Sequence, residues 1–167
     1  NLFHSDAQGA LNCNFFVVPE NFEASAQDLA KALNALKSLE FTGNLELNLP
    51  APPNFPNLES QLESIWKDPP EILSFHFGVP DQAILSQARS MTIKVGMTAT
   101  SAQEAEKVEK AGADFIVAQG IEAGGHRGVF QPDGEDKKLK TWELIKMLTD
   151  SSKLPLVAAG GIMNRNQ

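Results

Sequence analysis

The residues best suited to chemistry lie together in one glycine-rich stretch, residues 112–128. An apolar run over residues 115–118 is typical of a buried parallel strand. The loop that follows it contains Gln119, Gly120, Glu122, Gly124, Gly125, His126, Arg127 and Gly128. Histidine exchanges a proton readily near neutral pH, and the neighbours of His126 carry little side-chain bulk. We therefore expect His126 to be a general acid or base, with a structural role as the alternative. We expect Arg127 to face solvent or form a structural ion pair, with anion binding as the alternative.

Small and polar residues also follow the other strand-like segments. They are Ser74, His76 and Gly78; Thr98 and Thr100; Gln119 and Gly120; and Gly160 and Gly161. The carboxyl ends of strands converge on the active site of a parallel barrel. Four successive strand ends of this kind therefore predict a shared ligand, although each one alone fits an ordinary turn. The Gly160 and Gly161 amides could hold a phosphate, and His76 fits a packing role and a ligand-facing role equally well.

Alternating strands and helices must position these groups. We expect strands at 11–18, 71–78, 92–97, 114–119 and 154–161, and helices at 24–39, 58–66, 81–88, 101–110 and 141–148. This alternation predicts parallel βα units and an α/β fold. A closed (β/α)₈ TIM barrel needs about 250 residues, so we expect a partial barrel of about five parallel strands. An open doubly wound sheet is the structural alternative, but no Gly-x-Gly-x-x-Gly follows the first strand.

The organisation along the chain is that of one domain over residues 1–167. Within it, residues 40–70 are expected to form an irregular proline-rich loop in which 58–66 has helical character. The residues expected to cap helices are Asp81, either Thr100 or Ser101, and Gly112. Glu104 has the spacing of a capping box with Ser101.

Composition excludes several classes of protein. The formal net charge of −7 argues against nucleic-acid binding and against a basic membrane surface. No apolar run is long enough to span a membrane, and no signal peptide is recognisable. The single cysteine, Cys13, cannot form an internal disulfide, which predicts a reducing, cytoplasmic location. The histidines lack the spacing of metal ligands. The first residue is not Met, so we expect a fragment of a longer chain.

The motifs together resemble the nitronate monooxygenase family, formerly called 2-nitropropane dioxygenases. The resemblance is strong over residues 71–163 and weaker over 1–70. It is carried by Ser-Phe-His-Phe-Gly at 74–78, Thr-Ala-Thr-Ser at 98–101, Val-Ala-Gln-Gly at 117–120, Glu-Ala-Gly-Gly-His-Arg-Gly at 122–128 and Ala-Ala-Gly-Gly-Ile at 158–162. The family's Ala-Pro-Met segment and its last strands have no counterpart in the sequence.

The resemblance implies a function and a set of site residues. The family uses FMN in a (β/α)₈ barrel and oxidises alkyl nitronates, and in some members nitroalkanes, with molecular oxygen and without a metal. His126 matches its catalytic base, and His76 is assigned to the substrate. The residues assigned to the cofactor are Gln119, Gly124 and Gly125 at the flavin ring, Gly160 and Gly161 at the phosphate, and Thr98, where some members place a lysine near the flavin.

Two other interpretations remain open at this point. The FMN-type enoyl-acyl-carrier-protein reductases share a Gly-Gly-His motif and would require NAD(P)H. The chain could also be a non-catalytic fragment without bound flavin. The expected partners are a small nitronate, molecular oxygen and a second copy of the chain in a homo-oligomer, because open edges of a parallel sheet invite pairing.

Overall fold

The computed structural model describes residues 9–18, 25–38 and 55–164. The chain divides into two compact units, one formed by Asn1–Val18 with Leu58–Gln167 and the other by Pro19–Asn57. In the second unit the described element is α1, Ala26–Lys37, which begins where the Ser25 hydroxyl accepts a hydrogen bond from the Asp28 amide at 3.1 Å. The single domain expected over residues 1–167 stays a prediction, and residues 40–54 of the proline-rich segment lie outside the described residues.

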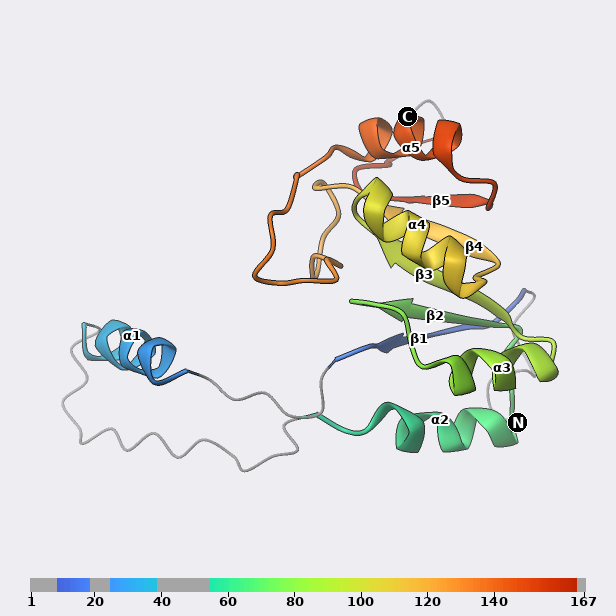
Figure 1. Cartoon of the computed structure of the whole chain (residues 1–167), viewed down its shortest axis with the longest axis horizontal. Helices are drawn as coiled ribbons and strands as arrows, with labels where there is room; N and C mark the ends of the chain where they lie inside the picture. The colour runs from blue at the N-terminus through green and yellow to red at the C-terminus, as the bar shows by residue number, and fades with distance from the viewer. Residues whose placement is uncertain (1–8, 19–24, 39–54, 165–167) are drawn as a thin grey trace. The chain divides into compact units, whose positions relative to one another are not determined.

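The first unit is built on a five-stranded parallel sheet (Figure 1). Its strands are β1 Asn12–Phe16, β2 Ile72–His76, β3 Lys94–Ala99, β4 Phe115–Gln119 and β5 Leu156–Ala159, in the order β1-β2-β3-β4-β5. Each strand pairs with the next one along the chain, so the strand order never reverses. A doubly wound sheet requires such a reversal, whereas a barrel adds strands in one direction. The structure therefore confirms a partial barrel of five parallel strands.

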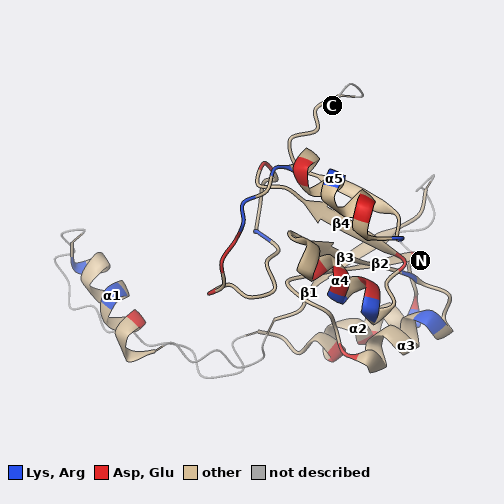
Figure 2. Ribbon diagram, turned by 45° about the horizontal axis from the view of Figure 1, so that its top comes forward, with Lys and Arg blue, Asp and Glu red and all other residues tan. Residues whose placement is uncertain are grey.

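Four helices follow one another around the outside of this sheet (Figure 1). They are α2 Leu58–Lys67, α3 Gln82–Ser90, α4 Ala102–Ala111 and α5 Thr141–Ser151. Their solvent-facing sides carry interspersed acidic and basic residues (Figure 2). This pattern is typical of amphipathic helices that cover a barrel.

The core lies between the helices and one face of the sheet. Side chains alternate along a strand, so Leu73, Phe75, Val95, Met97 and Ile116 point to this face, and each is at most 4% exposed. They pack with buried helix residues in a single cluster, among them Leu62, Leu85, Val108, Leu144 and Leu148. Complete burial of each such side chain contributes about 1.5–3 kcal/mol, so this face holds the sheet and its helices together.

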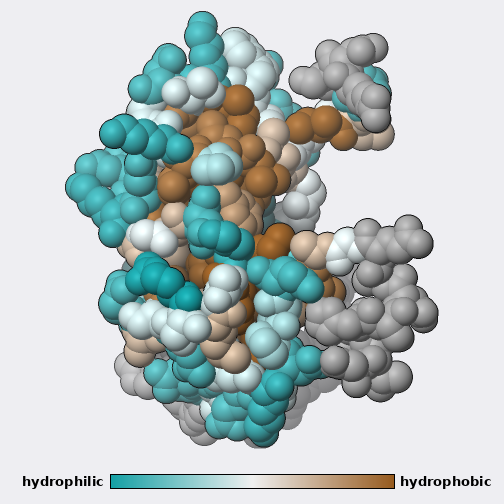
Figure 3. All heavy atoms as spheres, turned by 90° about the vertical axis from the view of Figure 1, so that its right-hand side faces the viewer, coloured by the Kyte–Doolittle hydropathy of each residue, from teal (hydrophilic) through white to brown (hydrophobic). Residues whose placement is uncertain are grey.

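The opposite face corresponds to the inside of the barrel. It carries the other set of alternating residues, and the structure pairs Thr98 with Val117 and Gln119 with Ala159 across its strands. Phe16 and Val157 on this face are 43% and 47% exposed. Figure 3 shows another side of the molecule, where apolar side chains gather in the middle of the view. Among the described residues, then, the helix-covered face is sealed and the inner face is partly open.

Local signals placed most element ends correctly. The Ser101 hydroxyl accepts a hydrogen bond from the Glu104 amide at 3.3 Å, and Gly112 ends α4 with φ 83°. The capping box was wrong in one respect, because the Glu104 carboxylate accepts from the amide and hydroxyl of Thr100, each at 2.7 Å. Asp81 occupies the N-cap position of α3 but makes no side-chain capping bond.

The expected start of β3 at Thr92 was also wrong. Thr92 has φ 62°, a left-handed conformation that no strand residue adopts. The strand begins two residues later, at Lys94.

Candidate active site

The loop after β4 is held by the side chain of Gln119, the last residue of that strand. Its Nε2 donates to the carbonyl oxygen of His126 at 2.9 Å, and its Oε1 accepts from the Gly128 amide at 2.8 Å. Gln119 is only 7% exposed. Both hydrogen bonds fix the loop backbone, while the His126 side chain remains exposed at the surface.

His76, at the end of β2, holds the same peptide from the other side. Its Nε2 lies 3.2 Å from the His126 carbonyl oxygen, and its Nδ1 lies 2.9 Å from the Thr98 hydroxyl. A carbonyl can only accept, so Nε2 must carry the proton, and in the neutral ring Nδ1 accepts from Thr98. Burial lowers the pKa of His76, as does the charge of His126, and these effects outweigh the hydrogen bond to the His126 carbonyl. The structure thus favours a neutral His76 whose two nitrogens are both engaged.

Gly128 makes this arrangement possible by its lack of a side chain. A Cβ atom at this position would lie 2.6 Å from His76 Cε1 and 2.7 Å from Thr98 Cγ2. Both distances are well inside van der Waals contact. Only glycine lets the loop lie directly on the ends of β2 and β3.

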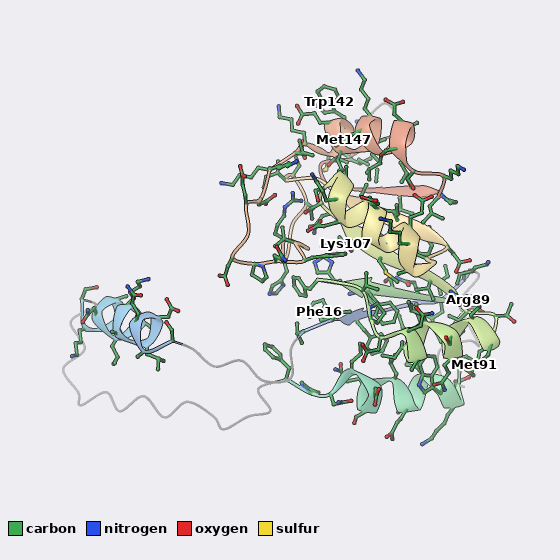
Figure 4. The ribbon with its side chains drawn as sticks, viewed as in Figure 1. Phe16, Arg89, Met91, Lys107, Trp142 and Met147 are labelled. Atoms are coloured by element: carbon green, nitrogen blue, oxygen red, sulfur yellow. The ribbon has the colours of Figure 1, made fainter. Side chains whose placement is uncertain are left out.

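Two aromatic rings that the sequence did not single out stand beside His126. The Phe16 and Phe77 ring centroids each lie 5.9 Å from the imidazole, and they lie 4.9 Å from each other. Phe16 is labelled on its strand in Figure 4. Phe77 has φ 72°, and a bulky residue in this region signals strain that often marks functional sites. The available signal was the position of both residues at strand ends, Phe16 at the end of β1 and Phe77 just after β2.

A second hydrogen-bond network brings the glycines after β5 to the same loop. The Glu122 carboxylate accepts from the Thr141 amide at 2.9 Å, and the Thr141 hydroxyl donates to the Gly160 carbonyl oxygen at 2.9 Å. The hydrogen bond from the Thr141 backbone is the main reason why the pKa of Glu122 lies below its usual value. A Cβ atom at Gly160 would lie 2.6 Å from the Ala123 nitrogen. Gly160 is therefore next to the segment that contains Gly124 and Gly125.

The conformation of the two glycines after β5 suits a bound anion. Gly160 and Gly161 have φ 118° and 71°, which residues with a side chain rarely adopt. Within the described part of the chain, neither amide donates a hydrogen bond to another residue. Nothing lies within 4 Å of a Cβ atom built on Gly124 or Gly125. Free amides and open space are features that a phosphate and a flat ring system require, so these residues fit an FMN.

Arg127 forms the structural ion pair that was one of its expected roles. Its guanidinium binds Asp136 in a bidentate manner, with Nε–Oδ2 and Nη2–Oδ1 distances of 2.9 and 3.0 Å. Its Nη1 donates to the Gln119 carbonyl oxygen at 2.5 Å. This ion pair holds the pKa of Asp136 below its usual value, chiefly through the hydrogen bond from Arg127. Both side chains are 21% exposed, so the pair is partly shielded from water.

A cavity of about 210 Å³ lies beside Asp136 but is not lined by His126. It is lined by residues at the start of α4, including Thr100 and Glu104, and by the segment 129–137. His126 and the glycines proposed for the ligand, Gly124, Gly125, Gly160 and Gly161, do not line it. The candidate site is therefore outside this cavity, at the edge of the open inner face. Residues 9–18, 25–38 and 55–164 contain no cluster of His, Cys, Asp or Glu suited to a metal ion. The same parts of the chain contain no helix that could span a membrane.

Comparisons with known proteins place this chain in a family. The nitronate monooxygenase from Paraburkholderia phytofirmans is 50% identical over 105 residues, which are 63% of this chain and 29% of the relative. The nitronate monooxygenase from Pseudomonas aeruginosa is 47% identical over 103 residues, with 62% and 29% covered. The chain thus spans less than a third of the length of the curated relatives it matches.

A solved structure extends the likeness to the fold. The nitroalkane oxidase from Streptomyces ansochromogenes superposes with a TM-score of 0.73 at 31% identity, covering 92% of this chain and 44% of that one. A family model described as nitronate monooxygenase matches residues 11–167. The chain therefore belongs to the nitronate monooxygenase family.

Proposed function

We propose that the protein oxidises alkyl nitronates with molecular oxygen, giving carbonyl compounds and nitrite, with FMN as the cofactor. We propose further that it accepts nitroalkanes, from which His126, as the base, removes the proton. Family membership supports flavin-dependent oxidation, and the name of the nitroalkane oxidase neighbour supports nitro compounds as the substrate class. The chain covers under a third of the length of its curated relatives. The complete activity is therefore part of this proposal. A cytoplasmic location and a homo-oligomeric state are further parts of it.

The observation that carries the proposal is how His126 is held. His76 and Gln119 both donate to its carbonyl oxygen, so the backbone is fixed while the imidazole is exposed. The phenyl rings of Phe16 and Phe77 lie beside the imidazole. The imidazole can therefore take a proton from the carbon next to a nitro group, with the alkyl part against the two phenyl rings. A fixed base of this kind contributes about 10²- to 10⁴-fold to the rate.

The glycines and Thr98 are the groups proposed to hold the cofactor. The free amides of Gly160 and Gly161 would bind the FMN phosphate, and the open backbone at Gly124 and Gly125 would lie against the flavin ring. Gln119 and Thr98 would act there mainly by fixing the loop and His76. When bound, the flavin supplies the electron acceptor of the reaction. His76 would border the substrate with a carbon edge of its ring, since both its nitrogens are engaged.

The test replaces His126 by Asn and compares two forms of substrate. A neutral nitroalkane must lose a proton before oxidation, whereas a preformed nitronate has already lost it. We expect His126→Asn to lower nitroalkane turnover by at least about 100-fold, to retain nitronate turnover, and to retain the visible absorbance of bound FMN. Unchanged nitroalkane turnover would remove His126 from the role of base.

Two further outcomes would overturn the proposal as a whole. Purified protein that shows no flavin absorbance with or without added FMN would exclude the flavoenzyme. Oxidation of NAD(P)H with an enoyl thioester, without nitronate turnover, would indicate the reductase chemistry instead.

A further inference from the structure

We propose that Asp136 is a positioning residue for His126, acting through Arg127 and Gln119. This inference rests on the proposed function, because it concerns the geometry of the proposed base. Asp136 lies ten residues after His126 in the charged segment before α5 and has no ring or hydrogen-bond contact with the imidazole itself. Its influence would pass through a chain of four hydrogen-bonded groups.

The first step is that residues 126–128 are tied to a single residue at the end of β4. Gln119 binds the His126 carbonyl and the Gly128 amide with its side chain. Arg127, the residue between them, returns its guanidinium to the Gln119 backbone carbonyl. The three consecutive loop residues therefore all form hydrogen bonds with Gln119, two with its side chain and one with its backbone. We call this arrangement, Gln119 with residues 126–128, the Gln119 anchor.

The second step is that Asp136 sets the direction of the guanidinium. A bidentate carboxylate fixes both the position and the plane of an arginine head group. In this orientation, Nη1 is the nitrogen left to reach the Gln119 carbonyl. Without Asp136 the guanidinium, which is 21% exposed, would gain more from water than from one carbonyl. Loss of that hydrogen bond would loosen the Gln119 anchor from its backbone side.

The third step is that Asp136 is itself held in place. Its Oδ1 accepts from the Lys138 amide at 2.9 Å in addition to binding Arg127. The neighbouring acidic residues Asp133 and Glu135 are exposed. Neither of these two makes a hydrogen bond to another residue in the described part of the chain. Asp136 is thus distinguished from the acids around it by geometry, and Asp133 provides a matched control of the same residue type in the same loop.

The experiment compares Asp136→Asn with Asp133→Asn in the full chain. Hydrogen exchange at the Gly128 amide reports the Gln119 anchor directly, because that buried amide donates to Gln119 Oε1. We expect exchange to be roughly 10-fold faster in Asp136→Asn and unchanged in Asp133→Asn, since local opening sets the exchange rate. Arg127→Lys should behave like Asp136→Asn, because lysine keeps the charge but lacks the planar fork.

Turnover then tests whether the anchor positions the base. A misplaced base should lower kcat for the nitroalkane by roughly 10- to 100-fold and leave its KM unchanged. We expect kcat for the preformed nitronate to stay unchanged as well. Exchange that is no faster in Asp136→Asn than in Asp133→Asn would overturn the inference, and so would faster exchange with unchanged nitroalkane kcat. An equal loss with nitronate would overturn it too, because that pattern is expected of general damage to the site. If the unmodified protein oxidises neither substrate, the proposed function fails while the exchange result still decides whether the anchor depends on Asp136.

Discussion

Replacing Gly128 by Ala should disturb the candidate site by steric contact alone. The added Cβ would lie 2.6 Å from His76 Cε1 and 2.7 Å from Thr98 Cγ2, roughly 1 Å closer than carbon atoms normally approach. The loop must lift or the His76 ring must turn. Overpacking of this kind costs about 1–3 kcal/mol. Turning the ring would also weaken its two hydrogen bonds, each with a net contribution of about 0.5–1.5 kcal/mol.

Because the two hydrogen bonds are weakened and not broken, the expected total is a loss of about 2–4 kcal/mol in the free energy of unfolding. For a chain of this size each 1 kcal/mol lowers Tm by roughly 2–4 °C, so circular dichroism should show a fall of roughly 4–16 °C. Gly124→Ala is the matched control for stability, because nothing lies within 4 Å of a Cβ atom there. We expect it to change the unfolding free energy by less than about 0.5 kcal/mol.

A double-mutant cycle identifies the source of the loss. Thr98→Ser removes the methyl group that the new Cβ would meet and keeps the hydroxyl that binds His76. Combined with Gly128→Ala it should recover about 1 kcal/mol, seen as a non-additive coupling. Wild-type stability of Gly128→Ala, or strict additivity with Thr98→Ser, would refute the close approach of the loop to β2 and β3.

Two other changes test the network around the glycines after β5. Gly160→Ala should lower the free energy of unfolding by about 1–3 kcal/mol, because Gly160 has φ 118° and an added Cβ would meet the Ala123 nitrogen. An unchanged unfolding curve in urea would contradict this. Gly124→Ala again provides the control. The folded-state pKa of Glu122 lies below the ordinary value of 4.5, so its carboxylate stabilises the fold above pH 4.5, and this contribution is lost as the pH falls through the lower folded value. Glu122→Gln should therefore flatten the fall of Tm with decreasing pH below that point, whereas an acid response as steep as that of the unmodified protein would exclude the role of Glu122.

The fold could be predicted because its signals are local. Buried parallel strands appear in the sequence as short apolar runs, and the apolar run 115–118 predicted β4 to within one residue. Gly112 marked the end of α4 because a left-handed C-cap favours glycine whatever surrounds it. The number of strands followed from counting βα units, and their sequential order from the rule that neighbouring units pair. The structure added the register, which places Thr98 and Gln119 on the same face of the sheet.

The errors arose where a distant contact overrides a local preference. Glu104 has the spacing of a capping box with Ser101, yet its carboxylate is engaged by Thr100 and by the Phe130 amide at 2.8 Å. Phe130 is 26 residues away, and no pattern in α4 could indicate it. Thr92 has a good β propensity but takes a left-handed conformation at the tight turn after α3, which is closed by hydrogen bonds from Thr92 and Ile93 back to α3.

For the candidate site, the sequence predicted which residues take part but not the separate role of each one. The sequence suggested one reason for all the glycines of the loop, which was access to a ligand. The structure separates them, since Gly128 is required by His76 and Thr98, while Gly124 and Gly125 face open space. The family resemblance assigned Gln119 to the residues that line the flavin ring. Its contacts show a buried amide whose two ends both hold the loop.

The way His126 is held bears on what its replacement can reveal. Both hydrogen bonds that fix residue 126 end on its backbone carbonyl, which every amino acid possesses. The Gly128 and Arg127 contacts of the Gln119 anchor are likewise independent of the imidazole. Substitution at position 126 should therefore remove the proton-accepting group and its contacts with Phe16 and Phe77 while leaving the loop in place. A loss of nitroalkane turnover in His126→Asn would then report chemistry, whereas the same loss in Asp136→Asn would report position.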